Sequence, residues 1–270
     1  MEIHFKNILV GFDNSMSAQI ALKKAAEFAE RFKGKVHAIY VKNNSKPTNP
    51  TIEKSVHDIG KAHGVEIEFI ERKGKVYSEI SSYERELGAD LIIVGTHGNE
   101  GWQPFWLGSN AFRIVSAANC PAITIQEFTK DLPLQDIMLP IDDSDSTRQK
   151  VPYAAALAKG LHAKVHIYGV TQGSDNATVM RIKKYVEQTN EYLQKRGIVT
   201  TTKIDTGVKL VKSILDYRKE TKAGLLMMMT DTETTGFTMG SYASDIVNNC
   251  QVPVMSIHSR DLNVSGAVGY

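Results

Sequence analysis

Apolar and polar positions alternate in blocks along the chain, and each block predicts a strand or a helix. In the first half, short apolar and β-branched runs predict five strands, at about 7–12, 35–41, 66–71, 90–94 and 121–126. The first, fourth and fifth runs are almost entirely apolar, which is typical of parallel strands covered on both faces. Strands that alternate with helices over short loops predict a doubly wound parallel sheet with right-handed crossovers.

The segments between the strands carry apolar residues at helical spacing, which predicts helices with one buried face. Ser15 is placed to cap the first of these helices. In the second half, Pro152 should start the matching helix late or kink it. The two apolar stripes are Ala18, Ala21, Leu22, Ala25, Ala29 and Phe32 in the first half, and Val151, Ala154, Leu157, Ala158 and Leu161 in the second.

The sequence repeats itself. The stretch N-I-L-V-G-F-D-N-S at 7–15 matches D-I-M-L-P-I-D-D-S at 136–144. Further on, L-G-S-N-A-F-R-I-V at 107–115 matches M-G-S-Y-A-S-D-I-V at 239–247, in the same order and at a nearly constant offset. Such ordered matches are hard to obtain by chance, so the chain is predicted to contain two copies of one fold.

A short polar segment that contains a proline, residues 127–134, separates the two copies. We therefore expect one domain at 1–127 and a second at 135–260. The length of 270 residues is long for one domain and comfortable for two.

Composition excludes several classes of protein. With 42% hydrophobic and 23% charged residues, the chain has the make-up of an ordinary soluble protein. A formal net charge of +2 gives no basic footprint for nucleic acid. No apolar run approaches the roughly 18 residues of a membrane span, and the N-terminus lacks the layout of a signal peptide, so we expect a cytoplasmic protein. Cys120 and Cys250 are too few for a disulfide framework or a cysteine zinc site.

A glycine-rich loop, V-G-T-H-G-N-E-G-W-Q-P-F-W-L-G-S-N-A at 94–111, follows the predicted fourth strand. Gly95 and Gly98 predict backbone that a ligand approaches closely. Gly108 and Ser109 predict the start of a helix, whose N–H groups and positive dipole end attract anions. The loop therefore predicts a phosphate cradle, although it is neither a P-loop nor a G-x-G-x-x-G motif.

An aspartate, Asp13, ends the first predicted strand. In doubly wound sheets ligands bind beyond the carboxyl ends of the strands, where a carboxylate suits a ribose diol. The alternative is that Asp13 caps the first helix together with Asn14 or Ser15. Because the glycine loop should lie at the same edge of the sheet, we favour the ligand role.

The spacing G-x2-G-x9-G-S, the early aspartate and the two matching halves resemble the universal stress protein family, over residues 5–126 and 135–258. The resemblance implies two five-stranded domains with strand order 3-2-1-4-5. It also implies ATP, or else ADP or AMP, across the ends of strands one and four. The residues that it assigns are Asp13 for the ribose hydroxyls or the adenine side, Val41 for the adenine, and Gly95, His97, Gly98, Gly108, Ser109 and Asn110 for the phosphates. For His97 the resemblance is the only reason; an exposed loop histidine is the alternative.

The loop departs from the family at one point. It has no lysine or arginine between Gly95 and Ser109, so a triphosphate would depend on backbone N–H groups and on Mg²⁺. Trp102, Phe105 and Trp106 are expected to pin the loop or to form a contact face, with stacking on the cofactor as the alternative.

The second half lacks the phosphate cradle. Met229 and Thr232 stand where the first two glycines stood, and Asp231 and Glu233 add negative charge that repels phosphate. Asp142 persists together with Gly240 and Ser241; we interpret these residues as a cap and a helix start, and a less anionic ligand is the alternative. The acidic cluster Asp142, Asp143 and Asp145 fits a helix N-terminus, so no metal is expected.

Together these features predict a cytoplasmic, ATP-binding regulatory module of the stress response, with one competent site in the N-terminal domain. The alternatives are a slow ATP-hydrolysing or phosphoryl-transfer enzyme and a nucleotide-free interaction protein. No paired base and nucleophile is recognised, so at most slow hydrolysis is expected. We expect no nucleic-acid or membrane partner and leave any protein partner unidentified. The unprotected fifth strands, 122–125 and 254–257, predict a pseudo-dimer within the chain and allow a further homodimer.

Overall fold

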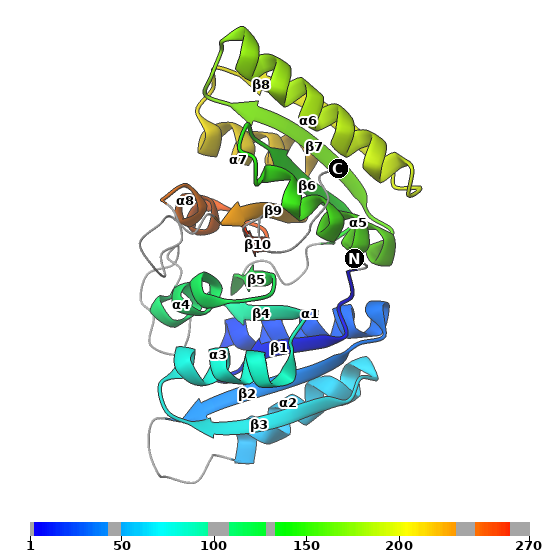
Figure 1. Cartoon of the computed structure of the whole chain (residues 1–270). Coiled ribbons are helices and arrows are strands. Elements are labelled where there is room, and N and C mark those ends of the chain that lie inside the picture. Colours follow the sequence, from blue (N-terminus) through cyan, green and yellow to red (C-terminus); the bar gives the residue numbers. More distant parts are fainter. Residues whose placement is uncertain (1–2, 43–49, 97–107, 128–132, 231–240, 260–270) are drawn as a thin grey trace. The chain divides into compact units, whose positions relative to one another are not determined.

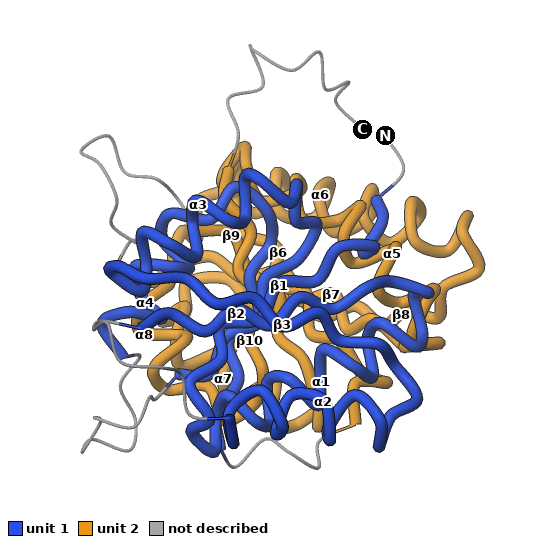
Figure 2. The backbone as a smooth tube through the Cα atoms, turned by 90° about the horizontal axis from the view of Figure 1, so that it is seen from below, with its two compact units in different colours: residues 1–131, 233–239 blue, residues 132–232, 240–270 orange. Residues whose placement is uncertain are grey.

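The computed structural model describes residues 3–42, 50–96, 108–127, 133–230 and 241–259. The chain divides into two compact units (Figure 2). Unit 1 comprises residues 1–131 with 233–239, and unit 2 comprises residues 132–232 with 240–270.

Unit 1 contains a five-stranded parallel sheet in the order β3-β2-β1-β4-β5 (Figure 1). In chain order its elements are β1 (Asn7–Gly11), α1 (Met16–Phe32), β2 (Lys35–Lys42), α2 (Pro50–His63), β3 (Ile67–Lys73), α3 (Val76–Leu87), β4 (Leu91–Gly95), α4 (Ser109–Ala117) and β5 (Ala122–Ile125). Helices α1 and α2 contact each other on one face of the sheet, and α3 and α4 contact each other on the opposite face (Figure 2).

Unit 2 repeats this arrangement with the sheet order β10-β9-β6-β7-β8. Its elements are β6 (Asp136–Ile141), the short 3-10 helix η2 (Thr147–Lys150), α5 (Val151–Leu161), β7 (Lys164–Thr171), α6 (Asn176–Gln194), β8 (Thr200–Thr206), α7 (Leu210–Thr221), β9 (Leu225–Thr230), α8 (Ser241–Asn249) and β10 (Val254–His258). In each unit the third strand in the chain lies at one edge and the first at the centre. The predicted α/β class and the order 3-2-1-4-5 are therefore confirmed for both halves.

The first strand of each unit is the centre of its core. Leu9 of β1 is aligned with His37 of β2 and with Ile92 of β4. Met138 of β6 holds the same place in unit 2. Both Leu9 and Met138 are fully buried, as expected for apolar strands covered on both faces.

The first helix begins differently in the two units. In unit 1 the Ser15 hydroxyl accepts a hydrogen bond from the Ala18 N–H at 3.3 Å, so Ser15 caps α1 as predicted. In unit 2 a 3-10 turn precedes α5, which begins at Val151 with Pro152 in its first turn. Proline is tolerated there because the first N–H groups of a helix have no partner within the helix.

Candidate functional site

The residues predicted to bind a nucleotide come from the carboxyl ends of three neighbouring strands of unit 1. Asp13 follows β1, Val41 lies near the end of β2, and Gly95 ends β4. Because β1 pairs in parallel with both β2 and β4, these ends reach the same edge of the sheet. Gly108, which precedes α4, is joined to this edge by the hydrogen bond from its N–H to the Thr96 carbonyl, at 2.7 Å.

Asp13 organises the turn that leads into α1. Its Oδ1 accepts a hydrogen bond from the Ser15 N–H at 2.9 Å, and Asn14 between them has the left-handed φ of 65°. In unit 2 the Oδ1 of Asp142 accepts from the Ser144 N–H, also at 2.9 Å. The same aspartate hydrogen bond therefore forms in both units, although Asp143 of unit 2 does not share the left-handed backbone of Asn14. The bond gives the first-strand aspartate a structural role with or without a ligand.

Gly95 and Gly108 both lie where a side chain would collide with the protein itself. A Cβ on Gly95 would lie 2.6 Å from Ser17 Oγ and 2.7 Å from the Ser17 carbonyl carbon. A Cβ on Gly108 would lie 2.8 Å from the Thr96 carbonyl oxygen. Each glycine thus has a packing reason, since Gly95 allows β4 to approach α1 and Gly108 allows the chain to return to the end of β4.

The start of α4 presents polar groups at this edge. Gly108 caps the helix without a side-chain hydrogen bond, and Ser109 and Asn110 are exposed. Helix geometry leaves the N–H groups of Ser109, Asn110 and Ala111 without partners inside the helix, which is the arrangement that attracts anions.

Part of the predicted site lies outside the described residues. The residues concerned are His97, Gly98, Trp102, Phe105 and Trp106 in the first half, and Asp231, Thr232, Glu233 and Gly240 in the second. The described part of unit 1 therefore contains the residues predicted for the ribose and the adenine, together with the start of α4.

The corresponding edge of unit 2 carries a large side chain instead of a glycine. Met229 is aligned with Ile257 in unit 2 as Gly95 is aligned with Ile125 in unit 1. The Met229 side chain is buried, with 7% of its surface exposed. The fourth strand of unit 2 thus ends near a buried side chain at the place where the fourth strand of unit 1 has a glycine packed against α1.

A buried lysine near this edge was not predicted from the sequence. Lys150 is 1% exposed, and its Nζ donates to the carbonyl oxygen of Thr147 at 2.7 Å and to the Thr147 hydroxyl at 3.1 Å. The same hydroxyl accepts from the Asp142 N–H at 3.0 Å, which ties the lysine to the aspartate turn. Lys150 precedes Ala154 by four residues, so it continues the apolar stripe, and that spacing was the available signal.

The acidic cluster of unit 2 is held by hydrogen bonds from other elements. The Thr171 hydroxyl at the end of β7 donates to Asp143 Oδ1 at 3.2 Å, and the Tyr185 hydroxyl of α6 donates to Asp145 Oδ1 at 3.4 Å. Within the described ranges, no three histidine, cysteine or carboxylate side chains are grouped to hold a metal ion.

Two segments of the chain match the family model described as the universal stress protein family, residues 4–126 and 133–258. The chain belongs to the universal stress protein family. The two matches cover both repeated halves, which shows a tandem arrangement of universal stress protein domains.

The relatives and solved structures described next are each less than 30% identical to this chain. A universal stress protein of Methanocaldococcus jannaschii is 28% identical over 145 residues, which cover 47% of this chain and 85% of the relative. The crystal structure of a universal stress protein from Archaeoglobus fulgidus covers 93% of this chain and 98% of its own, with a TM-score of 0.77 at 18% identity, and shows the fold alone. A universal stress protein solved in complex with cAMP matches 46% of this chain and 98% of its own at 22% identity. Its TM-score of 0.41 supports no conclusion about binding here.

In the described part of the chain, no helix has the length and apolar character that crossing a bilayer requires.

Proposed function

We propose that this tandem universal stress protein is a cytoplasmic regulatory module of the stress response, and that its N-terminal domain, residues 1–127, binds one adenine nucleotide. ATP is the favoured ligand, with ADP or AMP as alternatives, and Mg²⁺ assists the phosphates. The second domain, residues 135–260, keeps the fold without a competent nucleotide site. The observation that supports this asymmetry best is the buried Met229 side chain at the place of Gly95.

The roles of the binding residues follow the edge of the sheet. Asp13 receives the ribose hydroxyls beside its turn, and the backbone of Val41 meets the adenine. The phosphates lie against the start of α4, whose unpaired N–H groups favour anions. The residues assigned to the phosphates are Gly95, His97, Gly98, Gly108, Ser109 and Asn110.

Hydrolysis is at most a side reaction of this module. The loop offers positioning groups but no general base at a defined place, so turnover should stay far below the ~10 s⁻¹ typical of enzymes. A rate near that value, measured by phosphate release, would favour the alternative of an ATP-hydrolysing enzyme.

We further propose that the fifth strands, 122–125 and 254–257, pair with each other and make an intramolecular pseudo-dimer. Residues 122–125 are apolar or β-branched, residues 254–257 are apolar apart from Ser256, and neither stretch carries the charges that protect exposed edges. Slow hydrogen exchange at the amides of residues 122–125 is expected, and exchange as fast as that of exposed amides would contradict the pairing.

A charge placed at the start of α4 tests nucleotide binding without disturbing the core. In Asn110→Asp, the exposed side chain gains a carboxylate that favours the helix N-terminus and repels phosphate. The matched control is Tyr242→Asp, at the same place in α8. We expect calorimetry to show one Mg-ATP site per chain, weakened at least tenfold (about 1.4 kcal/mol) by Asn110→Asp and unchanged by Tyr242→Asp.

Three results would contradict this proposal. They are two equivalent sites per chain, undiminished binding by the Asn110→Asp variant, or equal losses in both variants. Binding that is equally tight after chelation of Mg²⁺ would remove only the proposed role of the cation.

A further inference from the structure

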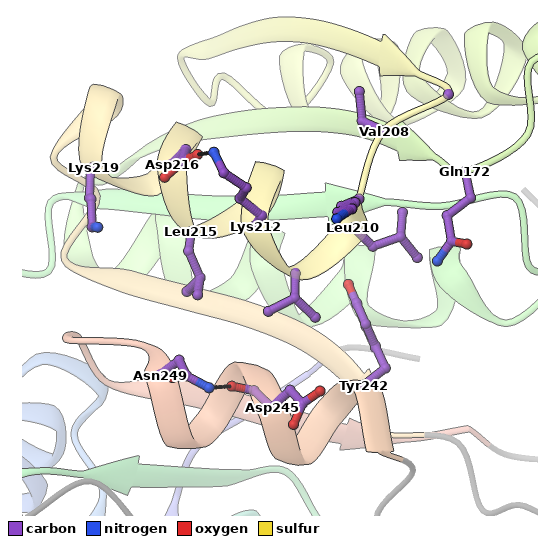
Figure 3. A pocket seen from close by; sticks show the side chains of 13 residues that line it. Gln172, Val208, Leu210, Lys212, Leu215, Asp216, Lys219, Tyr242, Asp245 and Asn249 are labelled. Carbon is purple, nitrogen blue, oxygen red and sulfur yellow. Dashed lines mark hydrogen bonds and ion pairs between the residues drawn. The ribbon is translucent and has the colours of Figure 1, made fainter.

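Unit 2 has a groove between α7 and α8 that the nucleotide proposal does not use. The groove encloses a cavity of about 870 Å³ and also receives residues from the loops after β7 and β8 (Figure 3). Leu215 and Lys219 extend from α7 toward α8, and Tyr242 extends from α8 toward α7 (Figure 3).

Apolar side chains form much of the groove lining. Val208, Leu210, Val211 and Leu215 line it and are each half-buried. Side chains of this kind retain apolar surface that another molecule can cover, at a gain of about 25 cal/mol per Å².

The α7 wall is basic. Lys209, Lys212 and Lys219 line the groove together with a single carboxylate on this wall, that of Asp216. Lys212 donates to Asp216 at 2.6 Å. That hydrogen bond lowers the pKa of Asp216, and the charges of Lys212 and Lys219 lower it further. The described residues provide no ion pair for Lys209.

The α8 wall carries a negative charge, that of Asp245. It contributes Asp245 and Asn249, and the Asn249 side-chain amide donates to the backbone carbonyl of Asp245 at 2.8 Å. A docked chain that bears carboxylates on one flank only is therefore oriented by the two walls.

The matching helices of unit 1 are bridged by side chains. The Arg113 guanidinium of α4 lies over the Tyr77 ring of α3, 5.0 Å from its centroid. At the corresponding places unit 2 has Val211 in α7 and Asp245 in α8. The smaller valine and the acidic residue do not form this bridge, and both line the groove instead.

We propose that this groove docks an amphipathic segment of a partner protein, with apolar residues on the valine and leucine lining and carboxylates facing α7. Lys209, which caps α7, and Lys219 within α7 are ten positions apart, which corresponds to about 15 Å at the rise of a helix. A single small anion does not span that distance, whereas about ten residues of a helical segment do. Docking of an amphipathic helix between two helices is a common mode of peptide recognition.

The test is a selection of random 16-residue peptides on the full-length protein, followed by fluorescence anisotropy with the enriched peptides. We expect enriched peptides with apolar residues at helical spacing and an excess of Asp and Glu. The double variant Lys209→Glu/Lys219→Glu should bind them at least tenfold more weakly. The matched control, Lys75→Glu/Arg85→Glu, changes the exposed residues at the corresponding places, the cap of α3 and its last turn, and should bind as the unaltered protein does.

A second variant separates docking from misfolding. Leu215→Ser places in α7 the residue that α3 carries at the same position, Ser81, so the helix tolerates it. It should weaken binding at least tenfold while the circular dichroism spectrum is unchanged. The proposal is overturned if no peptide is enriched, if the enriched peptides are neutral or basic, or if either groove variant binds them as tightly as the unaltered protein.

Discussion

The two units are alike at the end of their first strand and different at the end of their fourth. Asp13 and Asp142 each accept a hydrogen bond of 2.9 Å from the N–H two residues later. At the end of the fourth strand, in contrast, unit 1 has Gly95 packed against α1, and unit 2 has the buried side chain of Met229. A feature that both units share is explained by the fold, so the difference at the fourth strand is the better guide to which unit binds a ligand.

Gly95 has a role in packing besides its predicted role in binding. The sequence predicted that Gly95 leaves room for a ligand, whereas the structure places the α1 residue Ser17 where a side chain would be. Gly95 serves both the packing of α1 and the binding of a ligand if the ligand lies beside the contact with α1. Stability and binding therefore have to be measured separately at this position.

The largest expected effect is that of Gly95→Met, which gives unit 1 the residue of unit 2. The new side chain meets the Ser17 backbone, which cannot move without displacing α1, and we expect the free energy of unfolding to fall by about 3 kcal/mol. Urea denaturation measures the loss. The control Met229→Leu changes shape at nearly constant volume and should cost less than about 1.5 kcal/mol. A loss below about 1 kcal/mol in Gly95→Met would show that the close α1 contact does not require glycine.

The two first-strand aspartates are expected to give smaller effects that separate structure from binding. Asp13→Ala and Asp142→Ala each remove a turn cap, so each should lower the free energy of unfolding by about 1 kcal/mol. Only Asp13→Ala should also weaken Mg-ATP binding, by about tenfold in calorimetry. If Asp13→Ala binds ATP normally, the aspartate serves the turn alone and the alternative interpretation holds.

The smallest effect concerns the helix pairs. Arg113→Ala removes the cation–π contact with Tyr77, and because the arginine is exposed we expect a loss of about 0.5–1 kcal/mol. Asp245→Ala in unit 2 removes a residue that lines the groove, and its effect should stay within about 0.5 kcal/mol. Equal losses in urea denaturation would show that the α3–α4 bridge does not distinguish the two units.

The fold was predictable because its signals are local and occur twice. Apolar runs gave the strands, and the repeat together with the family resemblance gave the order 3-2-1-4-5, which both sheets confirm. The late start of the α5 helix followed from Pro152, since proline restricts the residues around it wherever it stands.

The site was harder to predict because the spacing of glycines shows where side chains are missing and does not show what lies there. Ser17 is far from Gly95 in sequence, and only the packing of α1 on the sheet brings them together. The groove of unit 2 depends in the same way on which side chains of two helices meet. Lys150 is different, because its spacing from Ala154 places it on the apolar stripe and is visible in the sequence.

The hydrogen bond from the Gly108 N–H to the Thr96 carbonyl affects how freely the chain between these residues can change in length. It fastens together the two points where the chain leaves β4 and returns to α4, at 2.7 Å. Once its ends are fixed, an excursion of this kind can be lengthened at little entropic cost, about 0.6 kcal/mol for each doubling. We therefore expect a foreign segment inserted between these two points to leave the sheet that carries them undisturbed.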